Sequence, residues 1–420
     1  MDLKPLNQQT IDSEIRNLLK LICKPQVAVG LLRDMDSAEA FERKVLRARK
    51  KGVSDWRQKD GRLADGDRLE HLITLCQKRL EKEEAFRVFL GVGDLFKFHG
   101  DLRRAEELYT MVLRGGSRSG QREPVAEAYM RRGEVYSRQG RWSESASDLD
   151  QSREIYKALR EHLAIGRIEN ILGTSCAEQG KLKQAQGYFS RALAMFEKTK
   201  DTNMTGAVLM NIGIIHNIIG QHDLALAHYK RAQSQFEQIG DLNRLAELHH
   251  NMGMSYLSMS AFNDAIREFD SSLAFSSKSQ NVNLVGLASL GKANVYFRLR
   301  DFTIAFKLVD RAAECSTGSG DRLSLADAYK LKGMIHREMK RFSIAESYLQ
   351  TSQRINLELN NGLNAGETYF EMGLLEQKRG RKKEALVAFE HAYVFFKKVG
   401  AQSDVQRTEQ ALRSMGNKGR

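Results

Sequence analysis

Proline, cysteine and long apolar segments are scarce or missing in this chain of 420 residues, and each absence excludes a kind of structure or a class of protein. Only three prolines occur, Pro5, Pro25 and Pro124, so nearly the whole length is free to form helices. No apolar run reaches the roughly 18 residues of a membrane-spanning helix. The start, MDLKPLNQQTIDSEIRN, lacks a basic stretch followed by an apolar one. We therefore expect neither a membrane span nor a signal peptide.

Cysteines and histidines show no catalytic or metal-binding pattern. The four cysteines, Cys23, Cys76, Cys176 and Cys315, are scattered and lack the spacing of metal ligands, so we expect reduced thiols and a cytoplasmic protein. No HExxH motif, phosphate-binding loop or Gly-x-Ser-x-Gly motif occurs. His216 and His336 are expected to pack in the core. We expect no enzymatic activity, no cofactor and no metal.

What the sequence does contain is a small residue repeated at a stride of 40. The positions are Gly93, Gly133, Gly173, Gly213, Gly253, Ala293, Gly333 and Gly373. A second small residue follows each of them after 12 residues, and a bulky apolar one, such as Tyr109, Tyr229 or Phe389, after 16. A fixed period of this size is typical of a repeat architecture.

Each 40-residue unit is predicted to be two helices joined by a short turn. A glycine inside a helix costs about 1 kcal/mol relative to alanine. We expect the packing of the bulky residue against it to offset that cost. A further glycine often follows seven residues later, as at Gly100 and Gly220, and predicts the end of the first helix.

Three regions are predicted along the chain. Residues 1–80 form an N-terminal helical region, a cap or an effector module, with helices over about 11–21 and 37–50 and a third beginning near Asp67 as its N-cap. Residues 52–80 could instead be a decayed repeat with Trp56 in its core. Eight repeats occupy 84–399. Residues 401–416 form a C-terminal capping helix, with Ser403 as its N-cap and Val405, Ala411 and Leu412 facing inward.

The net charge of +13 includes one concentrated basic run, RKVLRARKK at 43–51, with six basic residues in nine. Such a run favours either a solvated helix face or a patch for nucleic acid or an anionic membrane.

The segments YMRRGEVYSRQGRWSESASDL and HNMGMSYLSMSAFNDAIREF resemble the tetratricopeptide repeat, in which small and aromatic residues alternate at fixed positions. The 40-residue unit is similar to the long-helix subgroup, which includes Pins-like adaptors and Rap-type peptide-sensing regulators. The resemblance implies an all-α fold, a right-handed α-solenoid of helix-turn-helix repeats with an N-terminal helical region and a C-terminal capping helix. It also implies a concave groove, lined by the first helices, that holds a partner peptide.

Candidate groove residues lie on the first helices opposite the small positions. The predicted partner-binding residues are Arg131, Arg138, Asn170, Asn211, Asn217, His250, Asn251, Asn294, Arg298, Lys330 and Arg337. Asn211 and Asn251 occupy the same position in adjacent repeats, where Pins-like adaptors use asparagines to contact a peptide main chain. The alternative is an amide satisfied by its own neighbours or by water.

The cations on this face could receive carboxylates, and Ile214, Met254 and Met334 could bind apolar groups. The expected partner is therefore a protein or peptide segment that is acidic and carries apolar anchors. The leading function is a non-enzymatic scaffold or adaptor. The alternatives are a Rap-like regulator with an N-terminal effector module and a basic repeat protein associated with nucleic acid.

Overall fold

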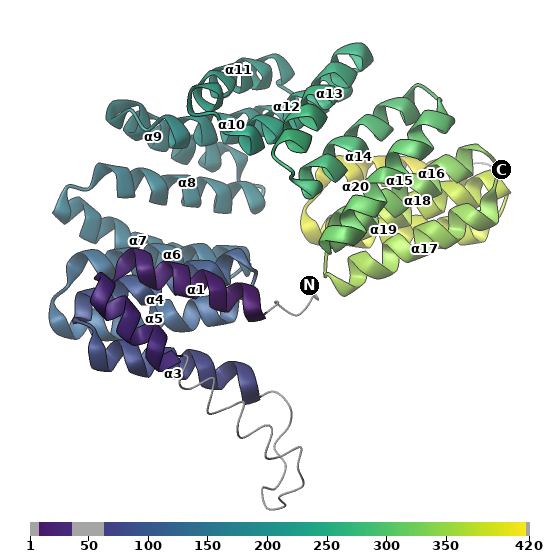
Figure 1. Cartoon of the computed structure of the whole chain (residues 1–420). Helices are drawn as coiled ribbons and strands as arrows, with labels where there is room; N and C mark the ends of the chain where they lie inside the picture. Colours follow the sequence, from purple (N-terminus) through teal and green to yellow (C-terminus); the bar gives the residue numbers. More distant parts are fainter. Residues whose placement is uncertain (1–7, 36–62, 417–420) are drawn as a thin grey trace, which may run out of the picture. The chain divides into compact units, whose positions relative to one another are not determined.

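The computed structural model describes residues 8–35 and 63–416, and all regular secondary structure in these ranges is helical (Figure 1). The helices follow one another in antiparallel pairs at the predicted stride. The first helices of the pairs are α4 (Lys82–Phe98), α6 (Arg122–Arg138), α8 (His162–Glu178), α10 (Thr202–Ile218), α12 (Leu242–Ser258), α14 (Val282–Arg298), α16 (Arg322–Glu338) and α18 (Gly362–Arg379).

Each first helix is followed by the second helix of its pair. The second helices are α5 (Leu102–Ser119), α7 (Trp142–Leu159), α9 (Leu182–Thr199), α11 (His222–Ile239), α13 (Phe262–Lys278), α15 (Phe302–Ser319), α17 (Phe342–Glu358) and α19 (Lys382–Val399). The predicted all-helical repeat fold is confirmed. Within the described ranges, every helix is too short or too polar to span a lipid bilayer.

The ends of the helices are set by local chemistry. A residue with positive φ ends most helices, as at Gly220 (φ 79°) and Gly240 (φ 68°), because glycine enters this conformation without steric cost. Aspartate or asparagine begins many of the next ones. The carboxylate of Asp241, for example, accepts a hydrogen bond from the Arg244 backbone N–H at 3.0 Å. Helix length in each repeat is therefore encoded at its two ends.

The recurring glycines lie where the two helices of a pair approach most closely. A Cβ placed on Gly133 would lie 2.8 Å from Leu149 Cγ, and one on Gly253 would lie 2.8 Å from Phe269 Cε1. The predicted role of these glycines in packing is thus confirmed. Where the series has alanine instead, at Ala293, the residue sixteen positions later is the smaller Val309, and both are fully buried.

The N-terminal helices pack on the first pair. Helix α1 (Gln8–Ile22) contacts α4, and a Cβ on Gly91 would lie 2.9 Å from Leu18 Cδ2. Residues 25–35 form a further helix that begins at Pro25. Proline suits the first turn of a helix because it has no N–H to leave unpaired. Helix α3 (Leu63–Arg79) also contacts α4.

One sequence prediction for this region is wrong, and three others lie outside the described residues. Asp67 was expected to begin the third helix, but α3 already begins at Leu63, so Asp67 lies inside the helix and the N-cap prediction is wrong. The predicted helix over 37–50, the basic run at 43–51 and Trp56 lie outside the described residues.

The C-terminal helix α20 (Gln402–Gly416) covers the last pair. Val405, Ala411 and Leu412 pack against a core that includes Phe389 and Phe396, as predicted. Ser403, expected to be the N-cap, lies within the helix instead, because α20 begins one residue earlier.

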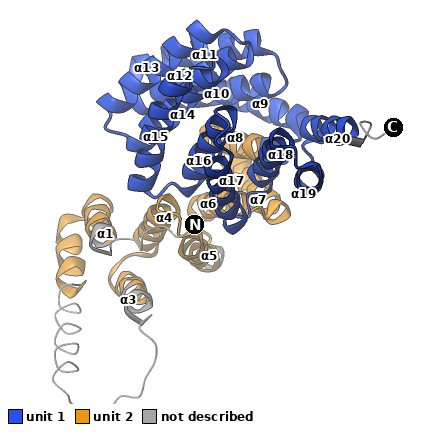
Figure 2. Ribbon diagram, turned by 90° about the vertical axis from the view of Figure 1, so that its right-hand side faces the viewer, with its two compact units in different colours: residues 1, 176–420 blue, residues 2–175 orange. Residues whose placement is uncertain are grey.

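The helices fall into two compact units (Figure 2). Unit 2 comprises residues 2–175, and unit 1 comprises residues 176–420 together with Met1. Unit 2 contains one core that runs from α1 to Val135 in α6. Unit 1 contains successive smaller cores, one for each step of the repeat. The division of the chain into 1–80, 84–399 and 401–416 remains a prediction.

Candidate functional site

The first helices form the inner face of unit 1. In that unit α10, α12, α14 and α16 each contact the next first helix along the chain, the last of these contacts being that of α16 with α18, whereas the second helices pack mainly on first helices. Helices that approach one another more closely on one side curve the array toward that side. The first helices therefore line its concave face, where the predicted groove lies. Of the predicted partner-binding residues, Arg131, Arg138 and Asn170 lie in unit 2 and the others in unit 1.

An uncharged stripe lies on the first three helices of this face, α10, α12 and α14. It combines partly buried amides with the apolar side chains Ile214 and Met254. Asn217 is held in place, because its Oδ1 accepts hydrogen bonds from Ser255 Oγ at 2.9 Å and His222 Nδ1 at 2.7 Å. The stripe therefore contains at least one amide that is fixed by its own chain.

The other asparagines of the face differ in their surroundings. The Asn294 Nδ2 donates to the Leu290 carbonyl at 3.1 Å, and Asn170 and Asn211 each take part in a further contact within the chain. Among the described residues, no group pairs with the Asn251 side-chain amide. Asn251 is partly exposed on α12, so both its donor and its acceptor are available to a ligand.

His250 is next to this amide and is held neutral. Burial lowers the pKa of its imidazole to about 4, because the low-dielectric surroundings disfavour the charged form. Its ring lies 5.5 Å from that of Phe269, and its Nδ1 is buried without a hydrogen-bond partner in the described chain. An uncharged ring beside an available amide makes this part of α12 a polar but neutral surface.

Most predicted cations of the groove already have carboxylate partners. In unit 2, Arg131 pairs with Glu127 at 2.7 Å and with Asp94, and Arg138 pairs with Glu134 at 2.9 Å. These contacts join neighbouring turns and neighbouring first helices.

In unit 1, Lys330 pairs with Glu367 at 2.5 Å and with Asp327 at 3.0 Å, and Arg337 pairs with Glu371 and, at 3.2 Å, with Glu338. Although burial alone would lower the pKa of Lys330, its two carboxylates raise it. Arg298 is exposed at the end of α14 and has no partner among the described residues. It is the predicted cation of unit 1 that remains available for an acidic ligand.

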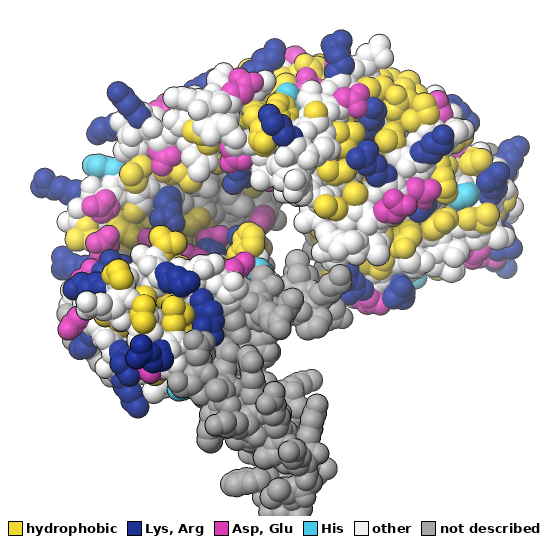
Figure 3. Space-filling model, in the orientation of Figure 1, with side chains coloured by type: hydrophobic (Ala, Val, Ile, Leu, Met, Phe, Trp, Pro, Cys, Tyr) yellow, Lys and Arg dark blue, Asp and Glu magenta, His cyan; other side chains and the backbone are white. Residues whose placement is uncertain are grey.

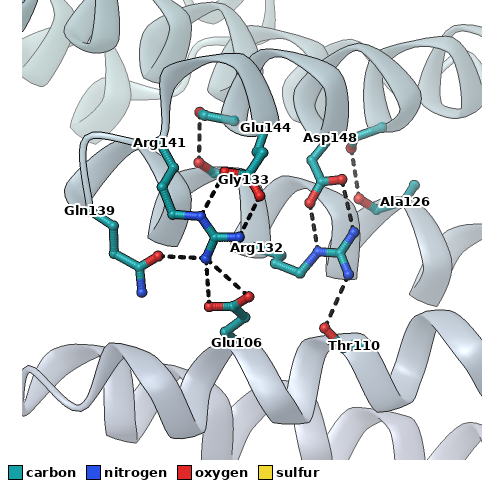
Figure 4. A network of polar contacts seen from close by, with 11 residues as sticks. Glu106, Thr110, Ala126, Arg132, Gly133, Gln139, Arg141, Glu144 and Asp148 are labelled. Atoms are coloured by element: carbon teal, nitrogen blue, oxygen red, sulfur yellow. Dashed lines mark hydrogen bonds and ion pairs between the residues drawn. The ribbon is translucent and has the colours of Figure 1, made fainter.

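The structure adds contacts that the sequence analysis did not identify. Arg132 binds both carboxylate oxygens of Asp148, at 2.7 and 2.9 Å, and Thr110 Oγ1 at 3.0 Å, while Arg141 joins Glu106 to Glu144 (Figure 4). These residues link α5, α6 and α7 of unit 2. The separations differ, with Arg132 and Asp148 16 residues apart and Arg141 and Glu106 35 residues apart, so no single spacing in the sequence identifies these pairs.

The histidine predictions have two outcomes. His336 is buried in the core, as expected, and stacks on Tyr348 with ring centroids 5.6 Å apart. His216 is only partly buried and stacks on His228 at 5.3 Å, with its Nδ1 bonded to Gln221 at the surface. In the part of the chain that the structure describes, no group of His, Cys, Asp and Glu side chains is arranged to hold a metal ion.

The chain is similar in sequence and in structure to known repeat proteins. Its sequence matches the family model described as Tetratricopeptide repeat at residues 124–198, 204–278 and 285–358. These matches cover more than half of the chain, which therefore belongs to the tetratricopeptide repeat family and is a repeat scaffold. The match indicates no enzymatic family. No curated protein matches the chain.

Solved structures share the fold. The apo form of the quorum sensor NprR from B. thuringiensis is 15% identical, with 79% of this chain and 94% of that chain covered and a TM-score of 0.62. A Rap protein complexed with Competence and Sporulation Factor is 14% identical, with 98% of each chain covered and a TM-score of 0.51. The apo form of RapI is 12% identical over 66% of this chain and 99% of that one, with a TM-score of 0.56.

Proposed function

We propose that this protein is a non-enzymatic adaptor whose concave face in unit 1 binds an extended segment of another protein. The observation that carries the proposal is the uncharged stripe on α10, α12 and α14, with the available amide of Asn251 at its centre. A surface formed by packed helices is ordered before binding, so the protein loses little conformational entropy when a ligand arrives. That one structural neighbour was solved in complex with Competence and Sporulation Factor supports a binding role for this fold.

The chemistry of the stripe defines the ligand. An amide offers a donor and an acceptor to a peptide main chain, whatever the peptide's side chains are. Ile214 and Met254 lie beside the amides and suit apolar side chains of the ligand. The sequence predicts an acidic partner, but Lys330 and Arg337 are already paired with carboxylates of this chain. An acidic group of the partner could therefore pair only with Arg298 among the predicted cations of unit 1. We therefore propose a partner segment with apolar anchors and few acidic groups.

The test selects random peptides on the immobilised full-length chain and then titrates a selected peptide against variants. The double variant Asn211→Ala/Asn251→Ala should raise the Kd at least about tenfold, which corresponds to about 1.4 kcal/mol. Asn203→Ala, on the exposed side of α10, is the matched control and should leave the Kd unchanged. Equal affinity of the double variant and wild type would exclude the amides from the site.

A second candidate is a regulator of the Rap kind, in which the N-terminal helices act as an effector module. It is favoured by the alignment with the Rap protein along nearly the whole of both chains and by the packing of α1 on α4. Here a bound peptide should change hydrogen exchange in α1 and α3. A plain adaptor would show changes only in the helices of the groove.

The nucleic-acid alternative rests on the basic run at 43–51, outside the described residues, and the cytoplasmic location remains a prediction.

A further inference from the structure

Four exposed apolar side chains recur at one position of consecutive helix pairs in unit 1. They are the residues that end α10, α12, α14 and α16, namely Ile219, Met259, Leu299 and Met339. They lie 40 residues apart, and each is between 39% and 44% exposed. Because consecutive first helices are in contact, their equivalent ends form a row along one edge of the unit.

Further apolar side chains follow on the other side of the same turns. Leu224, Ile304 and Ile344 lie in the first turns of α11, α15 and α17 and are 49%, 38% and 45% exposed. We call these residues, together with the four helix ends, the turn ridge. Figure 3 shows exposed hydrophobic side chains, interspersed with basic and acidic ones, over the α12–α15 part of the molecule.

The repeat itself does not require apolar residues at these positions. The equivalent helix ends of α4 and α6 are His99 and Gln139. A helix end next to solvent normally gains nothing from a large apolar side chain, and contiguous exposed apolar surface marks an interaction site. The turn ridge is therefore a surface that lacks its partner in the isolated chain, and it adjoins the concave face described above at Arg298, which ends α14.

The charges along the ridge identify that partner. In the turns at 218–224 and 258–264 there are two acidic residues, Asp223 and Asp264, and no lysine or arginine, but Asp264 is paired with Arg267 of the same helix. In the turns at 298–304 and 338–344 there are four basic residues, Arg298, Arg300, Lys340 and Arg341, and two acidic ones. The first half of the ridge is thus acidic through Asp223, and the second half has an excess of basic residues.

We propose that the turn ridge is an interface between two copies of this chain, paired antiparallel about a twofold axis. A twofold axis at the middle of the ridge places the Ile219 turn of one copy against the Met339 turn of the other, and Met259 against Leu299. The acidic half of each copy then faces the basic half of its partner, so two antiparallel copies of the ridge are complementary in charge. A parallel arrangement would bring like charges together and is disfavoured.

The size of the ridge suits a dimer. Four contacting first helices at a spacing of about 10 Å give a row on the order of 30 Å long. A stable interface buries roughly 800 Å² on each partner, which is a patch about 30 Å across. The polar turn residues beside the apolar row supply the rim of such a patch, as interfaces between proteins normally have.

Sedimentation equilibrium of the full chain at micromolar concentration tests the proposal. Wild type should be a dimer, and Met259→Glu/Leu299→Glu should raise the dimer Kd at least about 100-fold, because it places carboxylates at the centre of the interface. The matched control is Leu323→Glu/Leu363→Glu, which changes leucines of 43% and 41% exposure at the opposite ends of the helix pairs and should remain dimeric. Circular dichroism establishes that all three proteins are folded.

A charge exchange tests the antiparallel arrangement. Asp223→Lys should weaken the dimer, and Asp223→Lys/Lys340→Asp should restore it, because the two positions face each other across the axis. A monomeric wild type, or a dimer that the Met259→Glu/Leu299→Glu variant leaves intact, overturns the proposal. If the double charge exchange weakens the dimer more than Asp223→Lys does, the antiparallel pairing is wrong.

Discussion

Single residues in this protein show how helix propensity is balanced against packing. Each recurring glycine loses about 1 kcal/mol of helix propensity relative to alanine. In return, the second helix of the pair can approach until a ring or a leucine lies over the glycine backbone, as Phe269 does over Gly253. In the one repeat that has Ala293 in place of glycine, the residue sixteen positions later is the smaller Val309, and both are fully buried.

Gly213→Ala should destabilise unit 1. The new Cβ would lie 2.6 Å from Tyr229 Cδ1, and the fully packed ring has no room to move. Overpacking costs about 1–3 kcal/mol, which exceeds the gain of about 1 kcal/mol in propensity, so we expect a net loss of about 1 kcal/mol in urea unfolding. Gly318→Ala is the control: nothing lies within 4 Å of its Cβ, so this change should be neutral or stabilising. A stabilising Gly213→Ala would contradict the packing argument.

His250 should make stability depend on pH. Its pKa of about 4 in the folded protein lies below the ordinary value of about 6.5, so the unfolded chain takes up a proton first as the pH falls. Stability is therefore complete above about pH 6.5 and declines toward pH 4. Wild type should lose about 1–2 kcal/mol more than His250→Gln between pH 7 and pH 5, as measured by urea unfolding at both values. Equal losses of unfolding free energy in wild type and His250→Gln would show that His250 does not contribute to the pH dependence of stability.

At the scale of helices, ion pairs between neighbouring elements differ in burial and therefore in importance. Arg132 and Asp148 join α6 to α7 with side chains only 17% and 9% exposed (Figure 4). Arg141 joins α5 to α7 through Glu106 and Glu144, with the three side chains 36%, 26% and 49% exposed. Water therefore screens the ion pairs of Arg141 much more than the pair of Arg132 with Asp148.

Arg132→Ala should therefore destabilise unit 2 by about 3 kcal/mol, because it leaves the Asp148 carboxylate buried without a partner. Arg141→Ala, from the same network, should cost about 0–1 kcal/mol. The double variant Arg132→Met/Asp148→Leu should recover part of the loss, since it removes the unpaired charge. Thermal unfolding measures all three. Equal losses in the two single variants would mean that burial does not determine the strength of these pairs.

At the scale of the whole molecule, contacts are local. Each helix packs on its neighbours along the chain, and the described contacts join helices no more than three places apart in the helix order. The stability of such an array is the sum of the repeats and the interfaces between them. Damage to one repeat should therefore spread only to adjacent repeats.

Gly373→Ala tests this locality, because its Cβ would overlap the Phe389 ring in the last helix pair. Hydrogen exchange measured by mass spectrometry should increase in α17 to α20 and remain unchanged in α10 to α12. The equivalent change at Gly93 should affect α4 and α5 in the same local way. A uniform increase over all helices would show instead that the array unfolds as one cooperative body.

The sequence by itself determined the repeat. The 40-residue stride, the small residues and the turn residues act between positions close in the chain, so local rules predicted the helix pairs and the inward side of α20. Helix starts were less certain, as Asp67 and Ser403 show, because a polar residue can cap a helix or lie inside its first turn. Only the tertiary structure decided which groove cations were neutralised. Lys330 meets Glu367 and Arg337 meets Glu371 because adjacent repeats bring together side chains more than 30 residues apart, and no local pattern contains that pairing.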